Sequence, residues 1–467
     1  MRLNRFIINQ SGRLLIERGW TLLPLSRTVS SQAGWRLKSS LASSTESTLI
    51  EDDLTIKQLP PRFLRASDPS NFDPVTLQRC DVSYNASNGK PIPATGKPSC
   101  YEIESCHLDE DDDEYRVTWS DGHKSEYTVD WVNEQLAHWN GSSLSSGRTL
   151  WTGLTEDQLR RSRDKTLNLT DLLTEAGMQK AIRSLHQYGI LLVTNTPVDD
   201  NGAAIAAMAS CLGGGKVKNQ TTLLRHYLEG DDDGTIMLPR GTDGPLRTLY
   251  GTVWFTSSST QYAGTSIADS AYGHEGLPLH SDMTYYQDTA GLQIFTMVQP
   301  AEIGGESIYC DGFAAAQRLR EIHPEAFETL SNTVRRYRCV DLNTGWHLEA
   351  RGPIISVHNG QIISIRHNDL DRLPDLPPYG LTEAETTEFY ERLDDAHAAW
   401  DNILAQDDIR LVINMQKGDT IVVANQRCMH GRYSFKSSHN SPRIVTGCYV
   451  SKDEFYSRLR MEGYDIV

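Results

Sequence analysis

The sequence has few thiols, no long apolar segments and fewer positive than negative charges. Each of these deficits argues against some classes of protein. Its 467 residues include eight cysteines. They are scattered and form no C-x-x-C pair, which is typical of reduced thiols in an intracellular compartment. No apolar stretch reaches the roughly 18 residues that a membrane-spanning helix needs. Lys and Arg total 45 against 61 Asp and Glu, a net charge of −16, which argues against nucleic acid as the main partner.

The first 45 residues depart from this acidic balance. Seven basic residues and one acid, Glu17, give this segment a charge of +6, which leaves −22 for the rest of a chain whose total is −16. An Arg- and Ser-rich start that also holds Leu14 and Trp20 is typical of a mitochondrial transit peptide, the alternative being an ordinary disordered tail. We therefore expect residues 1–48 to be a targeting segment and the protein to lie in the mitochondrial matrix.

The remaining sequence predicts two domains. Residues 52–135 read as a small β-rich domain, in which the runs 115–119 and 124–131 alternate around Asp121-Gly122 as a hairpin does. Residues 137–165 are rich in Ser, Gly and polar side chains and read as a linker. Residues 166–467 form the larger domain. Its expected elements are a helix that ends near 188, helices at about 200–212, 312–333 and 382–405, and strands at 190–194, 291–298, 419–424 and 443–450.

Helices that flank many short strands favour a mainly β fold with flanking helices, of the α+β class. The particular architecture that we expect is a double-stranded β-helix, or jelly roll, with helical support.

A His-x-Asp pair provides the most informative chemistry. Two imidazoles and one carboxylate are the ligand set of a non-haem Fe(II) oxygenase, because they take one face of an octahedron and leave the other positions open. Side chains at i and i+2 of a strand point to the same side, so a strand can offer both ligands to one metal. The chain holds several such pairs or their Glu variants, at His107-Leu-Asp109, His280-Ser-Asp282, His323-Pro-Glu325, His347-Leu-Glu349 and His367-Asn-Asp369.

Context selects one of these pairs. His107 opens an acidic run that reads as a solvated loop, and His323 with its following proline reads as a helix start. His367 ends a good strand and stays a possible site residue. The pair at His280 and Asp282 is followed by a strand-like run, a Gly-Gly turn at 304–305 and a distal His430. We therefore predict a metal site formed by His280, Asp282 and His430.

Further residues suit the same site. Arg443 begins a late strand 13 residues after His430 and could hold a dicarboxylate co-substrate bidentately, although a surface ion-pair arginine is an open alternative. The hydroxyl of Ser307 could assist. Aromatic residues that recur among these positions could box a cation by cation–π attraction, or could be ordinary core residues. They are Tyr250, Trp254, Tyr272, Tyr285, Tyr286 and Tyr449.

Residues 250–313 and 418–460 resemble the 2-oxoglutarate-dependent dioxygenases of carnitine biosynthesis. This is the family of trimethyllysine and γ-butyrobetaine dioxygenases, within the taurine-dioxygenase-like superfamily. The resemblance extends over about 55–460. The strings that carry it are Tyr250-Gly-Thr-Val-Trp254, Asp269-Ser-Ala-Tyr272, Leu279-His-Ser-Asp-Met-Thr-Tyr-Tyr286, Gly304-Gly305, Cys310-Asp-Gly-Phe313 and Asn425-Gln-Arg-Cys-Met-His-Gly-Arg432.

The resemblance implies a set of functional residues and cofactors. It implies catalytic Fe(II) at His280, Asp282 and His430, and 2-oxoglutarate at Arg443 with Ser307 nearby. It implies O2 as co-substrate, ascorbate as reductant and a homodimer. It also implies an aromatic cage for a trimethylammonium group at Tyr250, Trp254, Tyr272 and Tyr449.

Asp269 bears on the substrate that the resemblance implies. γ-Butyrobetaine dioxygenases usually carry Asn at this position, and an acid suits a substrate with a free α-ammonium group. We therefore expect hydroxylation of N6-trimethyllysine at C3. The alternatives are γ-butyrobetaine dioxygenase, a hydroxylase of another small amine or acid, and a non-catalytic binding protein on the same scaffold.

The sequence also departs from the family. The N-terminal domain of relatives usually binds zinc through three Cys and one His. His123 matches that histidine, but the stretch 66–72 holds no thiol where the Cys cluster would fall. Cys80, Cys100 and Cys106 are loosely spaced for structural zinc. We therefore do not expect a zinc site. Gln426 stands where many relatives have Trp.

Overall fold

The computed structural model describes residues 55–73, 78, 84–85, 90–91, 102–139, 147–198, 202–214, 245–257, 273–342, 345–438 and 441–464. The predicted targeting segment lies outside the described residues, as do Asp269 and Tyr272. The N-terminal region up to residue 139 is described here by itself, and the region from residue 147 follows.

The N-terminal region contains a three-stranded antiparallel sheet of β3 (Ile103–Asp109), β4 (Glu114–Trp119) and β5 (Lys124–Thr128). The predicted hairpin is confirmed. Its second strand ends at Thr128, three residues before the predicted end at 131. α2 (Val129–Trp139) begins there, because Val132 and Leu136 repeat at the helical spacing and are both buried. The other elements are η1 (Thr55–Gln58), α1 (Pro61–Ala66), η2 (Pro69–Asn71), β1 (Tyr84–Asn85) and β2 (Lys90–Pro91).

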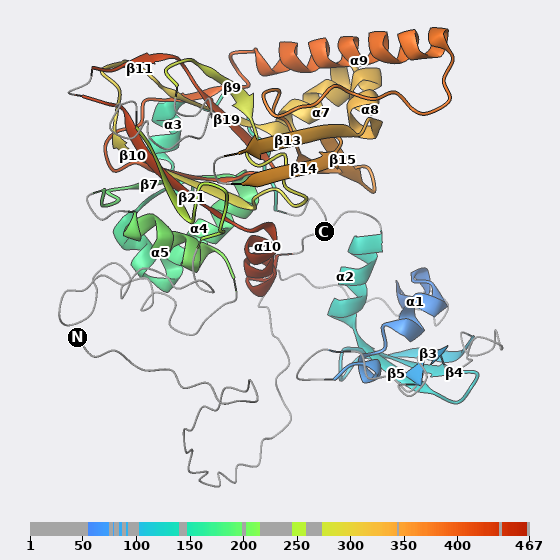
Figure 1. The fold of residues 1–467 in the computed structure, drawn as a ribbon. Helices are drawn as coiled ribbons and strands as arrows, with labels where there is room; N and C mark the ends of the chain where they lie inside the picture. The colour runs from blue at the N-terminus through green and yellow to red at the C-terminus, as the bar shows by residue number, and fades with distance from the viewer. Residues whose placement is uncertain are drawn as a thin grey trace, which may run out of the picture. The chain divides into compact units, whose positions relative to one another are not determined.

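A six-stranded sheet forms the centre of the larger region (Figure 1). Neighbouring strands are antiparallel except β6 and β7, which are parallel. In spatial order the strands are β6 (Thr166–Asn168), β7 (Ile190–Thr194), β18 (Thr420–Ala424), β10 (Leu292–Gln299), β21 (Ile444–Val450) and β8 (Val253–Ser257).

A four-stranded antiparallel sheet faces this first sheet. In spatial order its strands are β17 (Leu411–Ile413), β12 (Ser307–Asp311), β19 (Cys428–Arg432) and β9 (Leu277–His280). One apolar cluster takes buried side chains from both sheets, among them Leu192 and Val423 from the first and Tyr309 and Ile413 from the second. The two sheets therefore share a core.

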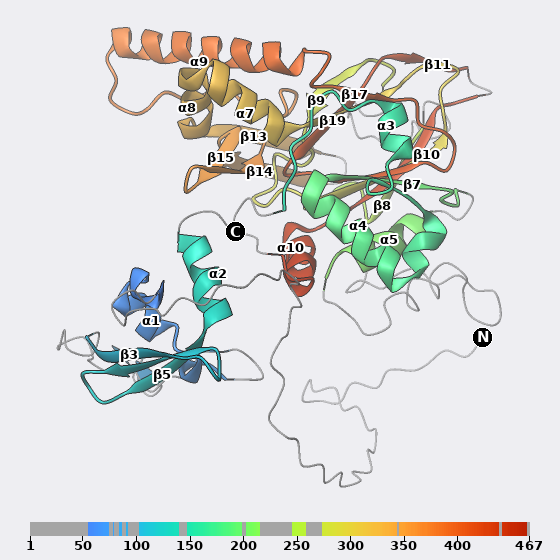
Figure 2. The ribbon, with the colours of Figure 1, turned by 180° about the vertical axis from the view of Figure 1, so that it is seen from behind.

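Helices cover the outer sides of the sheets, as Figures 1 and 2 show from opposite directions. α4 (Glu175–Tyr188), α5 (Ala203–Leu212) and α10 (Lys452–Met461) bury apolar side chains in one cluster with the six-stranded sheet. α7 (Gly312–Ile322), α8 (Pro324–Asn332) and α9 (Glu383–Leu404) share a second cluster with the four-stranded sheet. No helix among the described residues has both the length and the apolar content to cross a membrane.

The helical segment predicted at 312–333 consists of two helices, and the helix start predicted at His323 and Pro324 is confirmed. α7 ends at Ile322, and Pro324 begins α8, because a proline cannot donate to the preceding turn but fits the first position of a new helix. Three two-stranded antiparallel sheets complete the region. They are β11 (Ile303–Gly304) with β20 (Phe435–Lys436), β13 (Arg335–Asp341) with β14 (Trp346–Gly352), and β15 (Ile355–His358) with β16 (Gln361–Ile365).

Residues 147–165, within the segment that the sequence predicts as a linker, contribute to the core. Trp151 is buried, and so is Leu159 on α3 (Glu156–Arg161). Both belong to the cluster between the two sheets. The backbone N–H of Trp151 donates to Asp311 at 3.1 Å, and Arg427 donates to the carbonyl of Thr149 at 2.6 Å. The segment was predicted as a linker because Trp151 and Leu159 are isolated apolar residues in a mostly polar stretch.

Candidate active site

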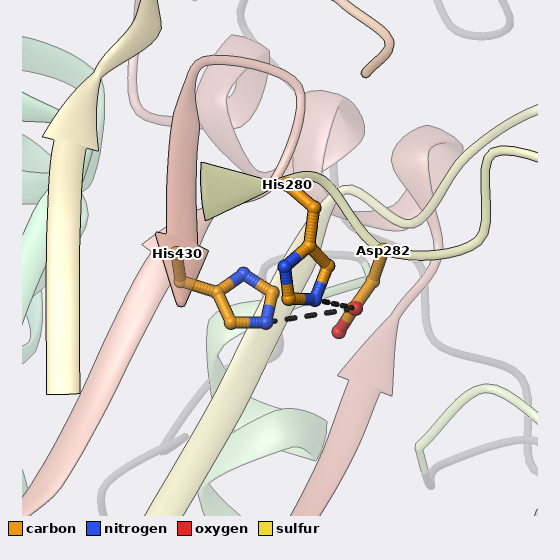
Figure 3. A group of neighbouring side chains, drawn as sticks. All are labelled: His280, Asp282 and His430. Atoms are coloured by element: carbon orange, nitrogen blue, oxygen red, sulfur yellow. Dashed lines mark ion pairs between the residues drawn. The ribbon is translucent and has the colours of Figure 1, made fainter. Parts of the chain in front are cut away.

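Strand pairing brings the three predicted metal ligands together. His280 is the last residue of β9 and lies directly opposite His430 on β19. The Nε2 atoms of both imidazoles lie 3.5 Å from Oδ1 of Asp282. Figure 3 shows the three side chains converging, with Asp282 on the loop that follows the strand. In the described part of the chain, they form one of two groups of three such residues with ligand atoms close enough to hold a metal ion.

Asp282 is not on a strand, although the sequence argument places both ligands on one. β9 ends at His280, and Met283 adopts the left-handed conformation, with φ of 61°. Asn425 holds this turn: its Oδ1 accepts from the backbone N–H of Asp282 at 2.8 Å, and its Nδ2 donates to the carbonyl of Asp282 at 3.0 Å. A clamped turn, not strand alternation, therefore directs the carboxylate.

Burial and mutual contact set the protonation of the triad. Burial lowers the pKa of His430 to about 4, and the charge of Asp282 opposes this shift. Burial alone would raise the pKa of Asp282, but His430, His280 and the hydroxyl of Tyr449 hold it well below its usual range. For His280, contact with Asp282 outweighs burial and raises the pKa. At neutral pH an ionised carboxylate thus faces a neutral imidazole at His430, as metal ligands require.

The other group of three is His367, Asp369 and Asp401. It contains the pair that the sequence argument left as a possible site. Asp369 already lies 3.4 Å from a guanidinium nitrogen of Arg335 and 3.4 Å from one of Arg372. Two positive charges beside this carboxylate oppose the binding of a cation, so the triad at His280 is the better metal site.

Arg443 is buried beside the triad. It precedes β21, is 4% exposed and lies near the rings of Phe435 and Phe295, at 5.4 Å and 6.0 Å from their centres. The alternative of a surface ion-pair arginine is therefore wrong. Burial lowers the pKa of Arg443 to about 10, with the nearby Arg432 adding to the shift, so the side chain stays cationic at neutral pH.

One cavity of about 510 Å³ connects these residues. The triad, Ser307 and Arg443 all line it. Positive charge comes from Arg432 on β19 and from Arg443, whereas negative charge beyond the triad comes from other elements: Asp341 on β13 and Asp371 in the loop after β16. The cavity therefore offers groups of opposite sign on separate elements.

Aromatic side chains form a further part of the lining: Tyr250, Trp254, Tyr285 and Tyr449. The rings of Trp254 and Tyr449 are 6.1 Å apart, and the hydroxyls of Tyr250 and Tyr285 are 3.3 Å apart. Trp254 lies against Gly447, where a Cβ would come within 2.1 Å of its indole ring. The structure brings three of the four predicted cage residues to this cavity, and Tyr272 is outside the described residues.

Several residues that line or support the site were not predicted from the sequence. Gln293 and Asn425 both contact Asp282, and Asp341 and Asp371 line the cavity. A signal for Gln293 was present, because it is an amide among the apolar residues at the start of β10, and the structure buries it to 3% exposed. Such buried polar groups need a partner.

His123 lies in the N-terminal region and pairs with a carboxylate. Its Nε2 is 2.5 Å from Oδ2 of Asp68, and Ser125 donates to the same oxygen. Asp68 is 1% exposed and falls within the stretch 66–72, which holds no thiol. Cys106 is half-buried on β3, whereas Cys80 and Cys100 lie outside the described residues. Among the described residues, His123 therefore belongs to a hydrogen-bonded network with Asp68 and Ser125.

Two imidazoles on paired strands and a carboxylate on the turn that follows one of them, with a buried guanidinium in the same cavity, define the site of a non-haem iron oxygenase. Comparison with known proteins agrees. The model of the family described as "Taurine catabolism dioxygenase TauD, TfdA family" matches residues 152–449, and the chain belongs to this family of 2-oxoglutarate-dependent dioxygenases.

Similar proteins carry a more specific name. The mitochondrial trimethyllysine dioxygenase of Mus musculus is 26% identical over 403 residues, which cover 84% of this chain and 83% of the relative. The enzyme of that name from Bos taurus is 25% identical over 409 residues, covering 85% and 84%. Among solved structures, AAD-2 in complex with Mn(II) and N-oxalylglycine is 13% identical with a TM-score of 0.41, covering 62% of this chain and 96% of that one.

Proposed function

We propose that the protein hydroxylates N6-trimethyllysine at C3, with Fe(II) as cofactor and 2-oxoglutarate and O2 as co-substrates. One oxygen atom enters the substrate as a hydroxyl group, and 2-oxoglutarate leaves as succinate and CO2. The observation that carries the proposal is the single cavity, which combines a metal ligand set, a buried arginine, aromatic rings and separate carboxylates. The names of the most similar relatives support the choice of substrate.

The residues present fit an iron ion. His280, Asp282 and His430 offer two imidazole nitrogens and a carboxylate oxygen that already face one another. When bound, Fe(II) with 2-oxoglutarate supplies the oxidation chemistry. The chain's contribution is to hold the ligands, to exclude bulk water and to position both organic molecules.

Arg443 is the residue proposed to bind the distal carboxylate of 2-oxoglutarate. A guanidinium can hold a carboxylate with two parallel hydrogen bonds, and burial between aromatic rings strengthens this attraction. Ser307 is proposed to assist, because it lines the same cavity at the start of β12 and pairs in register with Arg432.

Trimethyllysine carries a trimethylammonium group and an α-ammonium group, and the cavity offers partners for both. Tyr250, Trp254 and Tyr449 are proposed as cage residues for the first, with Tyr272 as a fourth member. Asp269 was the acid that the sequence suggested for the second. Asp341 and Asp371 add acidic groups to the lining of the same cavity, which supports a substrate with a second cationic group over γ-butyrobetaine, which has only one.

The test measures succinate release with Fe(II), ascorbate and 2-oxoglutarate, with and without trimethyllysine. We expect release to depend on trimethyllysine and to be lost in His280→Ala and His430→Ala. γ-Butyrobetaine and a panel of other small amines and acids serve as competing substrates. Absence of trimethyllysine-stimulated release would overturn the substrate assignment. If any other compound stimulates release, and the triad variants abolish it, the dioxygenase activity stands. A non-catalytic binding protein would release succinate with none of these compounds.

Further features are proposed with the function. The two facing sheets support a jelly-roll core in a domain of residues 166–467, to which the buried side chains of residues 147–165 also belong, preceded by a small β-rich domain at 52–135. The similarity to mitochondrial relatives and the basic start of the chain support the mitochondrial matrix. Ascorbate as reductant and a homodimer follow from family resemblance.

A further inference from the structure

The two oxygens of Asp282 face different partners. Oδ1 lies 3.5 Å from Nε2 of His280 and 3.5 Å from Nε2 of His430. Oδ2 accepts a hydrogen bond from the hydroxyl of Tyr449 at 2.8 Å and another from Nε2 of Gln293. One oxygen is thus turned toward the two imidazoles, and the other is occupied by two donors.

The sheet places these two donors as a pair. Gln293 on β10 and Tyr449 on β21 are direct partners across the antiparallel ladder. Opposite residues of such a pair project from the same face, with Cβ atoms about 5 Å apart. Both side chains are buried, at 3% and 5% exposed. Two side chains on neighbouring strands of the six-stranded sheet therefore donate to the same carboxylate oxygen.

Gln293 also contacts a second ligand. Its Nε2 lies 3.0 Å from Nε2 of His430, and an imidazole nitrogen that carries no proton can accept an N–H. The amide thus bridges Asp282 and His430. An imidazole nitrogen that binds a metal has no lone pair left to accept, so only the contact with Asp282 can persist in the loaded site.

We propose that Gln293, with Tyr449 beside it, is a positioning residue that makes Asp282 a one-oxygen metal ligand. By holding Oδ2, the pair keeps Oδ1 toward the metal and leaves a coordination position open that a two-oxygen carboxylate would occupy. This inference rests on the proposed metal site at His280, Asp282 and His430, and it assigns to Tyr449 a task besides its predicted place in the cage.

The test measures metal binding to the full-length protein in the absence of substrate. Mn(II) affinity is followed by electron paramagnetic resonance, and the coordination number is followed from the visible spectrum of bound Co(II). Loss of a residue that orients a metal ligand typically costs 10- to 100-fold in affinity. We expect a loss of roughly that size in Gln293→Leu, and a Co(II) spectrum shifted toward higher coordination number. Tyr449→Phe, which keeps the ring, should shift the spectrum in the same direction.

Gln426→Leu is the matched control. Gln426 is also a buried glutamine with two hydrogen bonds, to Thr289 and Tyr456, and neither partner is a metal ligand. The Gln426→Leu variant should bind Mn(II) with the same affinity as the unaltered protein. Unchanged affinity and spectrum in both Gln293→Leu and Tyr449→Phe would overturn the positioning role alone, provided that the unaltered protein binds Mn(II) and His280→Ala does not. Failure of the unaltered protein to bind would overturn the metal site and this inference together.

Discussion

The side chain of Asn425 holds the main chain of Asp282 from both sides, accepting from its N–H at 2.8 Å and donating to its carbonyl at 3.0 Å. Asn425 is 1% exposed and donates also to the carbonyl of Ala290 at 3.3 Å. One amide therefore ties the metal-binding turn to the start of the central strand β10. The conformation of the turn depends on it.

Replacement of Asn425 should weaken metal binding more than it lowers the stability of the fold. We expect Asn425→Ala to lower Mn(II) affinity roughly 10- to 100-fold, because the Asp282 carboxylate loses its fixed direction. The check is a metal titration together with a thermal unfolding curve. Asn414→Ala, at an exposed position directly after β17, is the control and should bind normally. Wild-type affinity in Asn425→Ala would show that the turn holds without the clamp.

Loss of the buried guanidinium should act on 2-oxoglutarate specifically. A hydrogen bond to a charged group contributes about 1.5–3 kcal/mol, so Arg443→Gln should raise the KM for 2-oxoglutarate roughly 10- to 100-fold. The KM for the amine substrate should change little. Initial rates at varied concentrations of each substrate separate the two effects. Arg351→Gln, at an exposed position of β14, should behave as the unaltered enzyme. An equal rise in both KM values would contradict a role confined to the co-substrate.

The aromatic lining should favour a cation. A desolvated cation–π contact contributes about 2 kcal/mol, so Trp254→Leu should raise the KM for trimethyllysine by roughly 30-fold and leave that for 2-oxoglutarate unchanged. Binding of the neutral analogue, with a tert-butyl group in place of trimethylammonium, provides the comparison. If the variant loses affinity for both compounds equally, the ring contributes packing and not cation recognition.

A buried ion pair should dominate the stability of the larger region. Arg427 and Asp311 lie 2.8 Å apart and are 4% and 1% exposed. Arg427→Met should lower the free energy of unfolding by about 3–5 kcal/mol, because the carboxylate stays buried without its partner. Adding Asp311→Asn should recover part of that loss in denaturant unfolding. Arg161→Met breaks an exposed pair with Asp157 and should cost less than about 1 kcal/mol. Comparable losses for the two arginines would refute the burial argument.

His397 should contribute to acid sensitivity. Burial, and then the charge of Arg335, lowers its pKa from 6.5 to about 4. The unfolded chain therefore binds a proton that the folded one does not between these two values. Stability is present above pH 6.5 and is lost as pH falls toward 4, with a slope of up to about 1.4 kcal/mol per pH unit for one proton. Urea unfolding of His397→Gln between pH 4 and 7 should show a shallower slope, and an identical slope would contradict this assignment.

The sequence predicted which residues meet at the candidate metal site, but it did not predict the residues that hold them in place. The choice of His280 over the other His-x-acid pairs rested on a following strand and a distal histidine, and the register of His280 opposite His430 confirms that these residues meet. The reason offered for Asp282 was wrong, because the strand ends before it. Strand alternation is visible in a sequence, whereas the clamp by Asn425 joins residues 143 positions apart and leaves no local pattern.

Packing explains the other differences. The segment around Trp151 reads as polar because its two apolar anchors are isolated among Ser, Gly and charged residues. Helix α9 was predicted at 382–405 and spans Glu383–Leu404, because its caps and its apolar period are both local features. Element types set by local chemistry were thus predictable, whereas contacts set by the meeting of two sheets were not.

The separation of charges around the cavity has a consequence for inhibition. Succinate retains the carboxylate proposed to face Arg443 but carries no cation for the aromatic rings or for Asp341 and Asp371. Succinate should therefore compete with 2-oxoglutarate for its binding site. It should not affect binding of the amine substrate. The enzyme would then respond to the ratio of two dicarboxylates in its compartment independently of how much amine is present.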